Sequence, residues 1–178
     1  MIAHPEIQKR AQDELDAVVG RACTPTFGDA PNLPYIQALV RELLRWRPAL
    51  PMGIPHTTTE DDWYEGMFIP KGTLCMVNLW QCHHDPALYG PDAASFNPER
   101  FLDEHGQLSP GPVETRDDGH SAYGFGRRAC VGKHAANDSL FINIAMVLWA
   151  ARLEPARDEN GKEIPVDAQT TVDLGNIL

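Results

Sequence analysis

Apolar residues recur every three or four positions in three stretches of this chain, with charged or polar residues between them. That spacing places the apolar side chains on one face of a helix. Gly20 is expected to end the first helix, while Pro34 opens the second and Pro48 forbids its continuation. The predicted helices cover residues 5–19, 34–46 and 133–152.

The pattern changes between the second and third helices. Residues 48–55 are rich in proline, which predicts an extended and irregular passage. Short runs of β-branched and apolar residues then predict strands, with a turn at Pro70-Lys71-Gly72. The predicted strands cover residues 56–59, 67–69 and 73–77, and short helical turns are expected over residues 80–84 and 86–89.

Residues 90–126 show no periodic pattern and are dense in proline, glycine, aspartate and asparagine. Such a long irregular stretch is unusual inside a compact domain, so we expect it to wrap around something else, such as a cofactor. Beyond the last helix, Asn160-Gly161 predicts a hairpin-type turn. Together these elements predict an α/β fold that is mostly helical and contains a small sheet.

The composition is that of a chain able to fold around a core. It has 178 residues, 43% of them hydrophobic, and its net charge of −10 argues against nucleic acid as the main partner. Its longest apolar stretch, residues 140–153, is shorter than the about 20 residues of a membrane span and predicts a buried helix. The first residues lack the apolar core of a secretory signal. Without CxxC spacing, four cysteines are expected as reduced thiols: Cys23, Cys75, Cys82 and Cys130.

The run Tyr-Gly-Phe-Gly-Arg-Arg-Ala-Cys-Val-Gly, residues 123–132, carries the strongest candidate chemistry. Arg127 and Arg128 bring positive charge close to Cys130, and the helix that follows presents its free amide groups and positive dipole end. Both effects favour a thiolate, and the glycines on either side let a flat ligand approach the backbone. The pattern is typical of a cysteine that binds haem iron through sulfur. The alternative is a buried, inert thiol.

The same run resembles the haem-binding signature of the cytochrome P450 family, which reads Phe-x-x-Gly-x-Arg-x-Cys-x-Gly. Tyr123 stands where the family usually has Phe, and its hydroxyl then needs a hydrogen-bond partner. The remaining signature positions are occupied by the family's own residues: Gly126, Arg128, Cys130 and Gly132. The resemblance implies that Cys130 is the axial ligand of the iron of haem b. It also implies that Arg128 contacts one haem propionate and that His56 contacts a propionate too, or is simply a partly exposed strand histidine.

A second resemblance involves an ion pair. Glu42 and Arg45 share a helix face, and periodicity alone predicts a solvated pair opposite the apolar stripe. However, Glu-Leu-Leu-Arg resembles the family's Glu-x-x-Arg helix, and Pro98-Glu99-Arg100-Phe101 resembles its Pro-Glu-Arg-Phe segment. The resemblance implies a structural triad of Glu42, Arg45 and Arg100, which would fix the irregular segment onto the helix and hold the cysteine loop.

The resemblance covers nearly the whole chain but only the C-terminal portion of a family member. It implies that residues 1–178 are a single partial domain: the haem-binding part of the P450 fold, with a small β-sheet and a long irregular segment before the cysteine loop. The family's oxygen-activating helix has no counterpart, so no catalytic residue is assigned. The implied function is a haem-dependent monooxygenase that inserts one oxygen atom from O2 into an apolar organic substrate. The alternative is a truncated, inactive fragment that binds haem weakly or not at all.

The resemblance also implies partners. Leu50, Met52 and Ile54 fall in the family segment that borders the substrate pocket, although ordinary core packing explains them almost as well. A flavoprotein reductase or a ferredoxin would supply electrons, docking on a basic cluster, unless these charges serve only the thiolate and the propionates. That cluster comprises Arg127, Arg128, Lys133 and His134. Relatives act on the cytoplasmic side and are often anchored to the endoplasmic reticulum; neither the anchor nor a membrane span is expected here.

Two other chemistries are disfavoured. Cys82, His83 and His84 are adjacent, and adjacent residues rarely converge on one zinc ion. A thiol-based redox module would need a resolving cysteine near Cys130, and none is present in the sequence.

Overall fold

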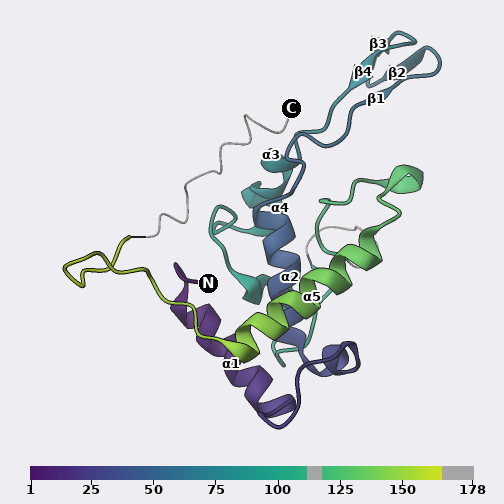
Figure 1. The fold of residues 1–178 in the computed structure, drawn as a ribbon. Coiled ribbons are helices and arrows are strands. Elements are labelled where there is room, and N and C mark those ends of the chain that lie inside the picture. Colours follow the sequence, from purple (N-terminus) through teal and green to yellow (C-terminus); the bar gives the residue numbers. More distant parts are fainter. Residues whose placement is uncertain (112–117, 166–178) are drawn as a thin grey trace. The chain divides into compact units, whose positions relative to one another are not determined.

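The computed structural model describes residues 1–111 and 118–165. The chain forms two compact units: Met1–Leu33 together with the described residues from Ile142 onward, and Pro34–Phe141. Figure 1 shows the elements in chain order. They are α1 (Pro5–Val18), η1 (Phe27–Asn32), α2 (Pro34–Trp46), β1 (His56–Thr57), β2 (Asp62–Tyr64), β3 (Met67–Ile69), β4 (Leu74–Cys75), α3 (Leu79–His83), α4 (Pro86–Tyr89), η2 (Pro98–Phe101), η3 (Gly126–Arg128) and α5 (Lys133–Ala150).

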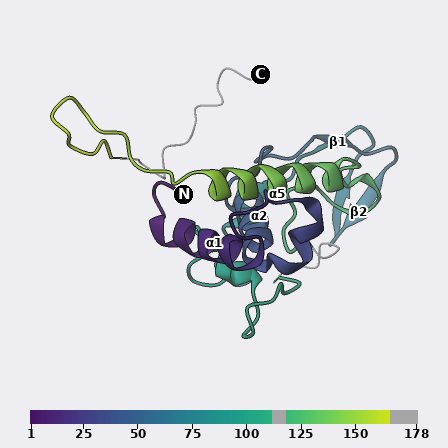
Figure 2. The ribbon, with the colours of Figure 1, turned by 60° about the horizontal axis from the view of Figure 1, so that its bottom comes forward.

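In the first unit, α1 lies beside the C-terminal end of α5 (Figure 2). Ile7, Ala11 and Leu15 of its predicted apolar face are buried, whereas Val18 is exposed. Gly20 ends the helix as expected, with φ +73° and its N–H donating to the carbonyl of Leu15. Two glutamines of α1 then form hydrogen bonds with the end of α5 and with the residues that follow it. Gln8 exchanges two hydrogen bonds with the backbone of Leu153, and Gln12 donates to the carbonyl of Leu148 at 2.9 Å.

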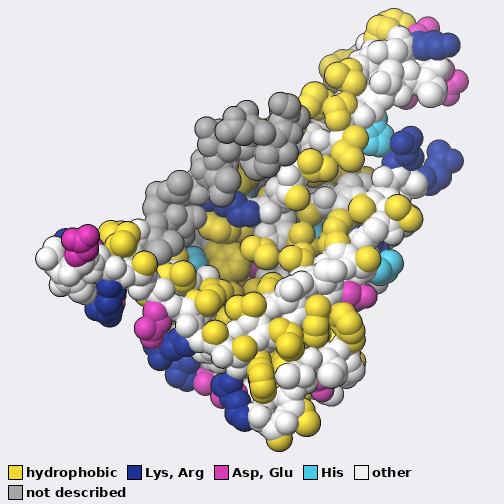
Figure 3. Space-filling view, in the orientation of Figure 1, with side chains coloured by type: hydrophobic (Ala, Val, Ile, Leu, Met, Phe, Trp, Pro, Cys, Tyr) yellow, Lys and Arg dark blue, Asp and Glu magenta, His cyan; other side chains and the backbone are white. Residues whose placement is uncertain are grey.

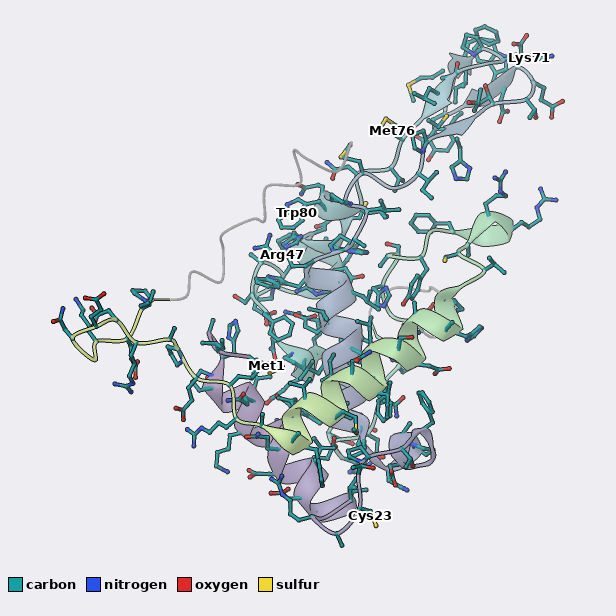
Figure 4. All side chains as sticks on the ribbon, in the orientation of Figure 1. Met1, Cys23, Arg47, Lys71, Met76 and Trp80 are labelled. Carbon is teal, nitrogen blue, oxygen red and sulfur yellow. The ribbon has the colours of Figure 1, made fainter. Side chains whose placement is uncertain are left out.

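In the second unit, α2 has the predicted bounds and buries its predicted stripe, led by Ile36, Leu39 and Val40. The short helix η2 packs on α2, and the ring of Phe101 is completely buried. Figure 4 shows Arg47 and Trp80 close together where α2 ends; the guanidinium carbon of Arg47 lies 5.1 Å from the centre of the Trp80 ring.

The strands form two antiparallel pairs that extend from α3 as an arm (Figure 1). β1 pairs with β4, and β2 pairs with β3 through a turn at Glu65-Gly66, where both residues have positive φ. The sequence pattern does not predict β2, since it indicates strands over residues 56–59, 67–69 and 73–77 only. Those residues do form a turn, since Thr73 donates to the carbonyl of Pro70, but it joins strands of different pairs.

The remaining predictions follow the expected pattern with one correction. Residues 90–126 are largely irregular where described, and Asn160-Gly161 closes a turn bridged by Arg157 and Glu163. Helix α5, expected to be buried, covers only one face: Phe141, Ala145 and Leu148 are buried, whereas neighbouring apolar residues are exposed. Periodicity predicts Leu140, Ile144 and Val147 or Leu148 on the buried side; Phe141 and Ala145 lie one position later, whereas Leu148 is buried as predicted. Within residues 1–111 and 118–165, no helix is both long and apolar enough to cross a bilayer.

Candidate functional site

The cysteine loop, defined here as residues 121–132, is held by its own backbone. Gly124 donates to the carbonyl of Ser121 at 2.9 Å, and Cys130 donates to the carbonyl of Tyr123 at 2.8 Å. Gly124 and Gly126 have φ of +76° and +55°, a conformation that a residue with a Cβ rarely adopts. A Cβ at either glycine would meet nothing within 4 Å, so this side of the loop is open.

The thiol of Cys130 is exposed, and the following Val131 is completely exposed. The alternative of a buried, inert thiol is therefore wrong for this structure. A Cβ at Gly132 would lie 3.8 Å from the sulfur, so this glycine leaves space beside the thiol. Helix α5 begins three residues after Cys130, and no described residue makes a hydrogen bond to the sulfur.

Tyr123 has the partner that its hydroxyl requires. The O–H donates to Oδ1 of Asn137 in α5 at 2.6 Å. Burial, followed by the nearby charges of Asp118 and Cys130, raises the pKa of Tyr123 to about 12, so the phenol remains a donor at neutral pH. The substitution of Tyr for Phe therefore adds a bond between the loop and α5.

The basic residues of the predicted cluster do not all behave alike. Arg127 and Arg128 are exposed, and neither guanidinium makes a hydrogen bond or an ion pair within the part of the chain that is described. Lys133 instead pairs with Asp118 at 2.8 Å, and both side chains are mostly buried. This corrects the predicted basic cluster: Asp118 neutralises the charge of Lys133, so Lys133 does not add to an exposed basic surface. His134 is exposed on α5, and His56 is exposed in β1.

The structure brings Glu42, Arg45 and Arg100 together. The first two have no solvent-exposed side-chain area, so the solvated pair expected from periodicity is wrong. Arg45 forms a forked pair with Glu42, with N–O distances of 2.6 and 2.7 Å. Nε of Arg100 lies 3.2 Å from the same carboxylate. We call these three side chains the buried ion cluster.

Backbone groups complete the buried ion cluster. Arg45 also donates to the carbonyls of His83, Ala93 and Ser95, and the N–H of Asn97 donates to Glu42 at 2.7 Å. Ala93, Ser95 and Asn97 lie in the irregular segment, and His83 is the last residue of α3. A single buried pair therefore fixes several turns of chain that have no regular structure of their own.

Sequence reasoning missed one member of this network, Asp92. It pairs with Arg100 at 3.0 Å, and its pKa lies below the usual range because of the hydrogen bond from Asn97, followed by that from Arg100. The only clue in the sequence is its place eight residues before Arg100, within an otherwise irregular stretch. Arg100 also donates to the carbonyl of Tyr89 at 2.6 Å.

Sequence reasoning also missed a buried polar pair. His83 and His120 are almost entirely buried, with ring centroids 6.2 Å apart. Burial is the main cause that lowers the pKa of His83 to about 4 and that of His120 to about 3, so both are neutral at pH 7. The neighbouring His84 bonds the carbonyl of Trp80 and stacks on its ring at 4.1 Å, so the two adjacent histidines have separate partners.

The apolar residues between α2 and β1 are exposed. Leu50, Met52 and Ile54 have exposed fractions of 50, 45 and 67%, so they are not core residues in this structure. Hydrophobic side chains also cover much of the strand arm (Figure 3). These surfaces are available to a ligand or to further protein.

Comparison with known proteins identifies the family. The cytochrome P450 family model matches residues 1–172. The chain belongs to the cytochrome P450 family. A cytochrome P450 monooxygenase of Armillaria gallica is 57% identical over 98% of this chain and 34% of its own length. The cytochrome P450 monooxygenase iboC of Amanita muscaria is 44% identical over 100% of this chain and 40% of its own length, and monooxygenase 58 of Postia placenta is 50% identical over 100% and 34%.

These P450 relatives bear out the family, the fold class and the monooxygenase activity of the family as read from the sequence. The chain spans about a third of the length of the curated relatives just named. Haem is the general cofactor of the P450 family. The ligand of its iron, the substrate and the electron donor are matters for proposal.

Proposed function

We propose that Cys130 binds the iron of haem b through its sulfur, and that the whole protein inserts one oxygen atom from O2 into an apolar organic substrate. The observation that supports this most is the exposed thiol, which lies in an open glycine loop immediately before a long helix. When bound, haem supplies the oxygen chemistry, and a sulfur ligand favours O–O cleavage.

The residues of the cysteine loop suit a flat cofactor held through sulfur. Gly132 leaves space beside the sulfur, and Gly126 leaves the preceding turn free of side-chain atoms. Arg128 has an unpaired guanidinium within the described chain, and its forked donors match a propionate; His56 is the second candidate donor. Tyr123 steadies the loop through Asn137.

The buried ion cluster positions this loop rather than taking part in chemistry. It leaves no exposed charge for a ligand, and it holds the irregular segment that leads to the cysteine. We therefore assign Glu42, Arg45 and Arg100 a structural role and assign no catalytic residue to this chain. Residues 1–178 are, in this proposal, one partial domain that provides the haem-binding part of the enzyme.

Partners follow from the exposed surfaces. Arg127, Arg128 and His134 form the remaining basic face beside the thiol, which suits an acidic electron donor such as a flavoprotein reductase or a ferredoxin. Binding that weakens with salt would support this face, and salt-independent binding would exclude it. Leu50, Met52 and Ile54 offer exposed apolar surface for an apolar substrate.

A second candidate rests on the exposure of the chain around the thiol. Val131 is fully exposed beside the thiol, so the isolated chain gives the haem little cover from water. In this alternative the isolated chain binds haem weakly or not at all and catalyses nothing. It concerns the isolated chain and leaves the role of Cys130 in the whole protein unchanged.

The deciding experiment is the absorption spectrum of the reduced, carbon monoxide-treated protein after expression with haem. We expect the Soret band that is typical of haem with a thiolate ligand, the thiolate-type band, and Cys130→Ser should abolish it. Cys75→Ser is the matched control, because Cys75 is also an exposed thiol but lies in β4. A histidine-type band, or the same loss in both variants, would refute ligation by Cys130, whereas no band at all supports the second candidate.

A paired substitution tests the propionate contact. Arg127 and Arg128 are neighbours in η3 and both are exposed, so they differ mainly in their place in the signature. Arg128→Ala is expected to weaken haem binding about tenfold, the loss of one charge-assisted hydrogen bond. Arg127→Ala should leave haem binding within about twofold by titration. Equal effects would mean that general charge, not a propionate contact, explains the arginines.

A further inference from the structure

His83 has contacts that the proposed function does not use. It is the last residue of α3 and has no exposed area. Its ring Nε2 lies 3.0 Å from the backbone nitrogen of Ser121 and 3.0 Å from the Ser121 hydroxyl. Because the N–H of Ser121 donates, Nε2 must be the unprotonated nitrogen, and the neutral ring carries its proton on Nδ1.

The other end of the same residue contacts the buried ion cluster. The carbonyl of His83 accepts a hydrogen bond from Nη1 of Arg45. The buried Nδ1 has no hydrogen-bond partner within the described residues. Burial lowers the pKa of His83, and the backbone of Arg45 acts in the opposite direction. His83 is therefore tied to Arg45 through its backbone and to the cysteine loop through its ring.

The hydrogen bonds continue from Ser121 toward the thiol. The carbonyl of Ser121 accepts from Gly124, and the carbonyl of Tyr123 accepts from Cys130. Other contacts fix the chain slightly earlier, where the hydroxyl of Tyr89 bonds the carbonyl of Gly119 at 3.2 Å. Among the described residues outside the cysteine loop, only His83 forms hydrogen bonds with Ser121.

We propose that His83 is a positioning residue that couples the buried ion cluster to the cysteine loop. Its ring acceptor fixes the N–H of Ser121, the first residue of the loop, while its carbonyl is fixed by Arg45. The coupling goes beyond the proposed function, since it concerns the protein without haem. Only its effect on the iron ligand rests on that function.

Two substitutions of equal length isolate the acceptor. In His83→Gln, the amide oxygen can accept from Ser121 in place of Nε2, whereas His83→Met fills a similar volume without an acceptor of comparable strength. Ser121→Ala is the control on the loop side, because it removes the hydroxyl and keeps the N–H that carries the coupling.

Amide hydrogen exchange of the haem-free chain is the primary measurement. In His83→Met, the amides of residues 121–130 should exchange about tenfold faster, the equivalent of one lost hydrogen bond at a buried site. His83→Gln and Ser121→Ala should stay within about threefold of the natural chain. The amides of α1, in the other compact unit, should be unchanged in all three and serve as the internal reference.

Unchanged exchange in His83→Met would overturn the coupling, and so would equal loss in the Gln and Met variants, which would mean that ring packing matters and the acceptor does not. If the Met variant does not fold, the Gln variant decides by the same threefold limit. After haem loading, the Met variant should lose part of the thiolate-type band and the Gln variant should keep it. Should Cys130 prove not to be the ligand, that band is uninformative, but the exchange result still stands.

Discussion

The buried ion cluster and the cysteine loop use the same side chain, arginine, for opposite purposes. Arg45 is completely buried, and its guanidinium donates to Glu42 and to three backbone carbonyls. Arg127 and Arg128 are exposed and have no partner within the described chain. A saturated guanidinium has no donor left for a ligand, whereas an unpaired one keeps all of its donors.

The backbones of the two regions differ in the same sense. The irregular segment is fixed mainly by side chains that come from α2, whereas within the cysteine loop the backbone is fixed by its own carbonyls and by positive-φ glycines, with contacts from His83 and Asn137 outside it. Rigidity in the first region thus depends on distant residues, and openness in the second depends on the absence of side chains. Substitutions should therefore have large effects on stability in the first region and small ones in the second.

Removing Glu42 should have the largest effect. Glu42→Ala leaves the buried Arg45 without a carboxylate and Arg100 with Asp92 alone, which should lower the free energy of unfolding by about 4 kcal/mol or more. Haem incorporation should be abolished, as it should in Arg45→Ala. Urea unfolding followed by circular dichroism measures the first effect, and the haem spectrum measures the second.

Glu104→Ala is the matched control for the Glu42 substitution, because that carboxylate is highly exposed and, among the residues that the structure describes, pairs only with its neighbour His105. It should change stability by less than about 0.5 kcal/mol. Normal haem retention in Glu42→Ala would show that the buried ion cluster does not hold the cysteine loop.

Crowding at Gly119 should give the next largest effect. A Cβ there would lie 2.7 Å from the buried Phe101 ring and 2.9 Å from the carbonyl of Pro110, and φ is +70°. Gly119→Ala should therefore cost about 3 kcal/mol by urea unfolding, from crowding and backbone strain together. Gly106→Ala has a similar φ of +74° but meets nothing within 4 Å, and should cost about 1 kcal/mol. Equal losses would mean that the segment yields around Phe101 instead of being fixed there.

The sequence predicts elements well where a local rule decides them. Helix α2 has its predicted bounds because Pro34 and Pro48 limit it from both sides. Helix α5 has apolar residues all around, so periodicity cannot choose its buried face, and Phe141 and Ala145 are buried one position after the predicted residues. Strand β2 escapes prediction because its turn cue, Glu65-Gly66, is a weaker signal than the Asn-Gly and Asp-Gly pairs of common hairpins.

In the candidate site, too, local features could be predicted from the sequence and contacts between distant residues could not. Spacing alone predicts that Glu42 and Arg45 pair, but it does not predict that they are buried. Their burial depends on the segment that contains Arg100, more than fifty residues further along the chain. His83 and Ser121 are 38 residues apart, and no periodic pattern relates them. The exposed glycine loop, by contrast, is a local feature and could be read directly from residues 123–132.

Acid should lower the free energy of unfolding through the buried histidines, His83 and His120. Burial lowers the pKa of His83 to about 4 and that of His120 to about 3, so unfolding allows both to take up a proton below their ordinary pKa of about 6.5. Stability is therefore full above pH 6.5 and falls as pH drops from there through about 4. The loss from His83 should be at most about 3 kcal/mol, measured by urea midpoints between pH 7 and 4.5.

His83→Gln should make the acid dependence shallower, because the variant has one buried titrating group fewer. His134→Gln is the control: this histidine is exposed on α5 and the slope should not change. If stability were constant from pH 7 to 4.5 in the natural chain, the two buried histidines would not be held neutral by the fold.

The smallest effect is expected at Tyr123, whose hydroxyl already has a hydrogen-bond partner in α5. Tyr123→Phe removes the hydroxyl that bonds Asn137 and restores the residue usual in the family, at a cost of about 1 kcal/mol in urea unfolding. Tyr64→Phe is the control, because the Tyr64 side chain is 61% exposed in β2 and should cost nothing measurable. The haem spectrum should not change in either variant, since the loop's shape depends on glycines and backbone bonds. A Tyr123→Phe variant that lost the thiolate-type band would show that the shape of this loop depends on the hydrogen bond to Asn137 as well as on its backbone.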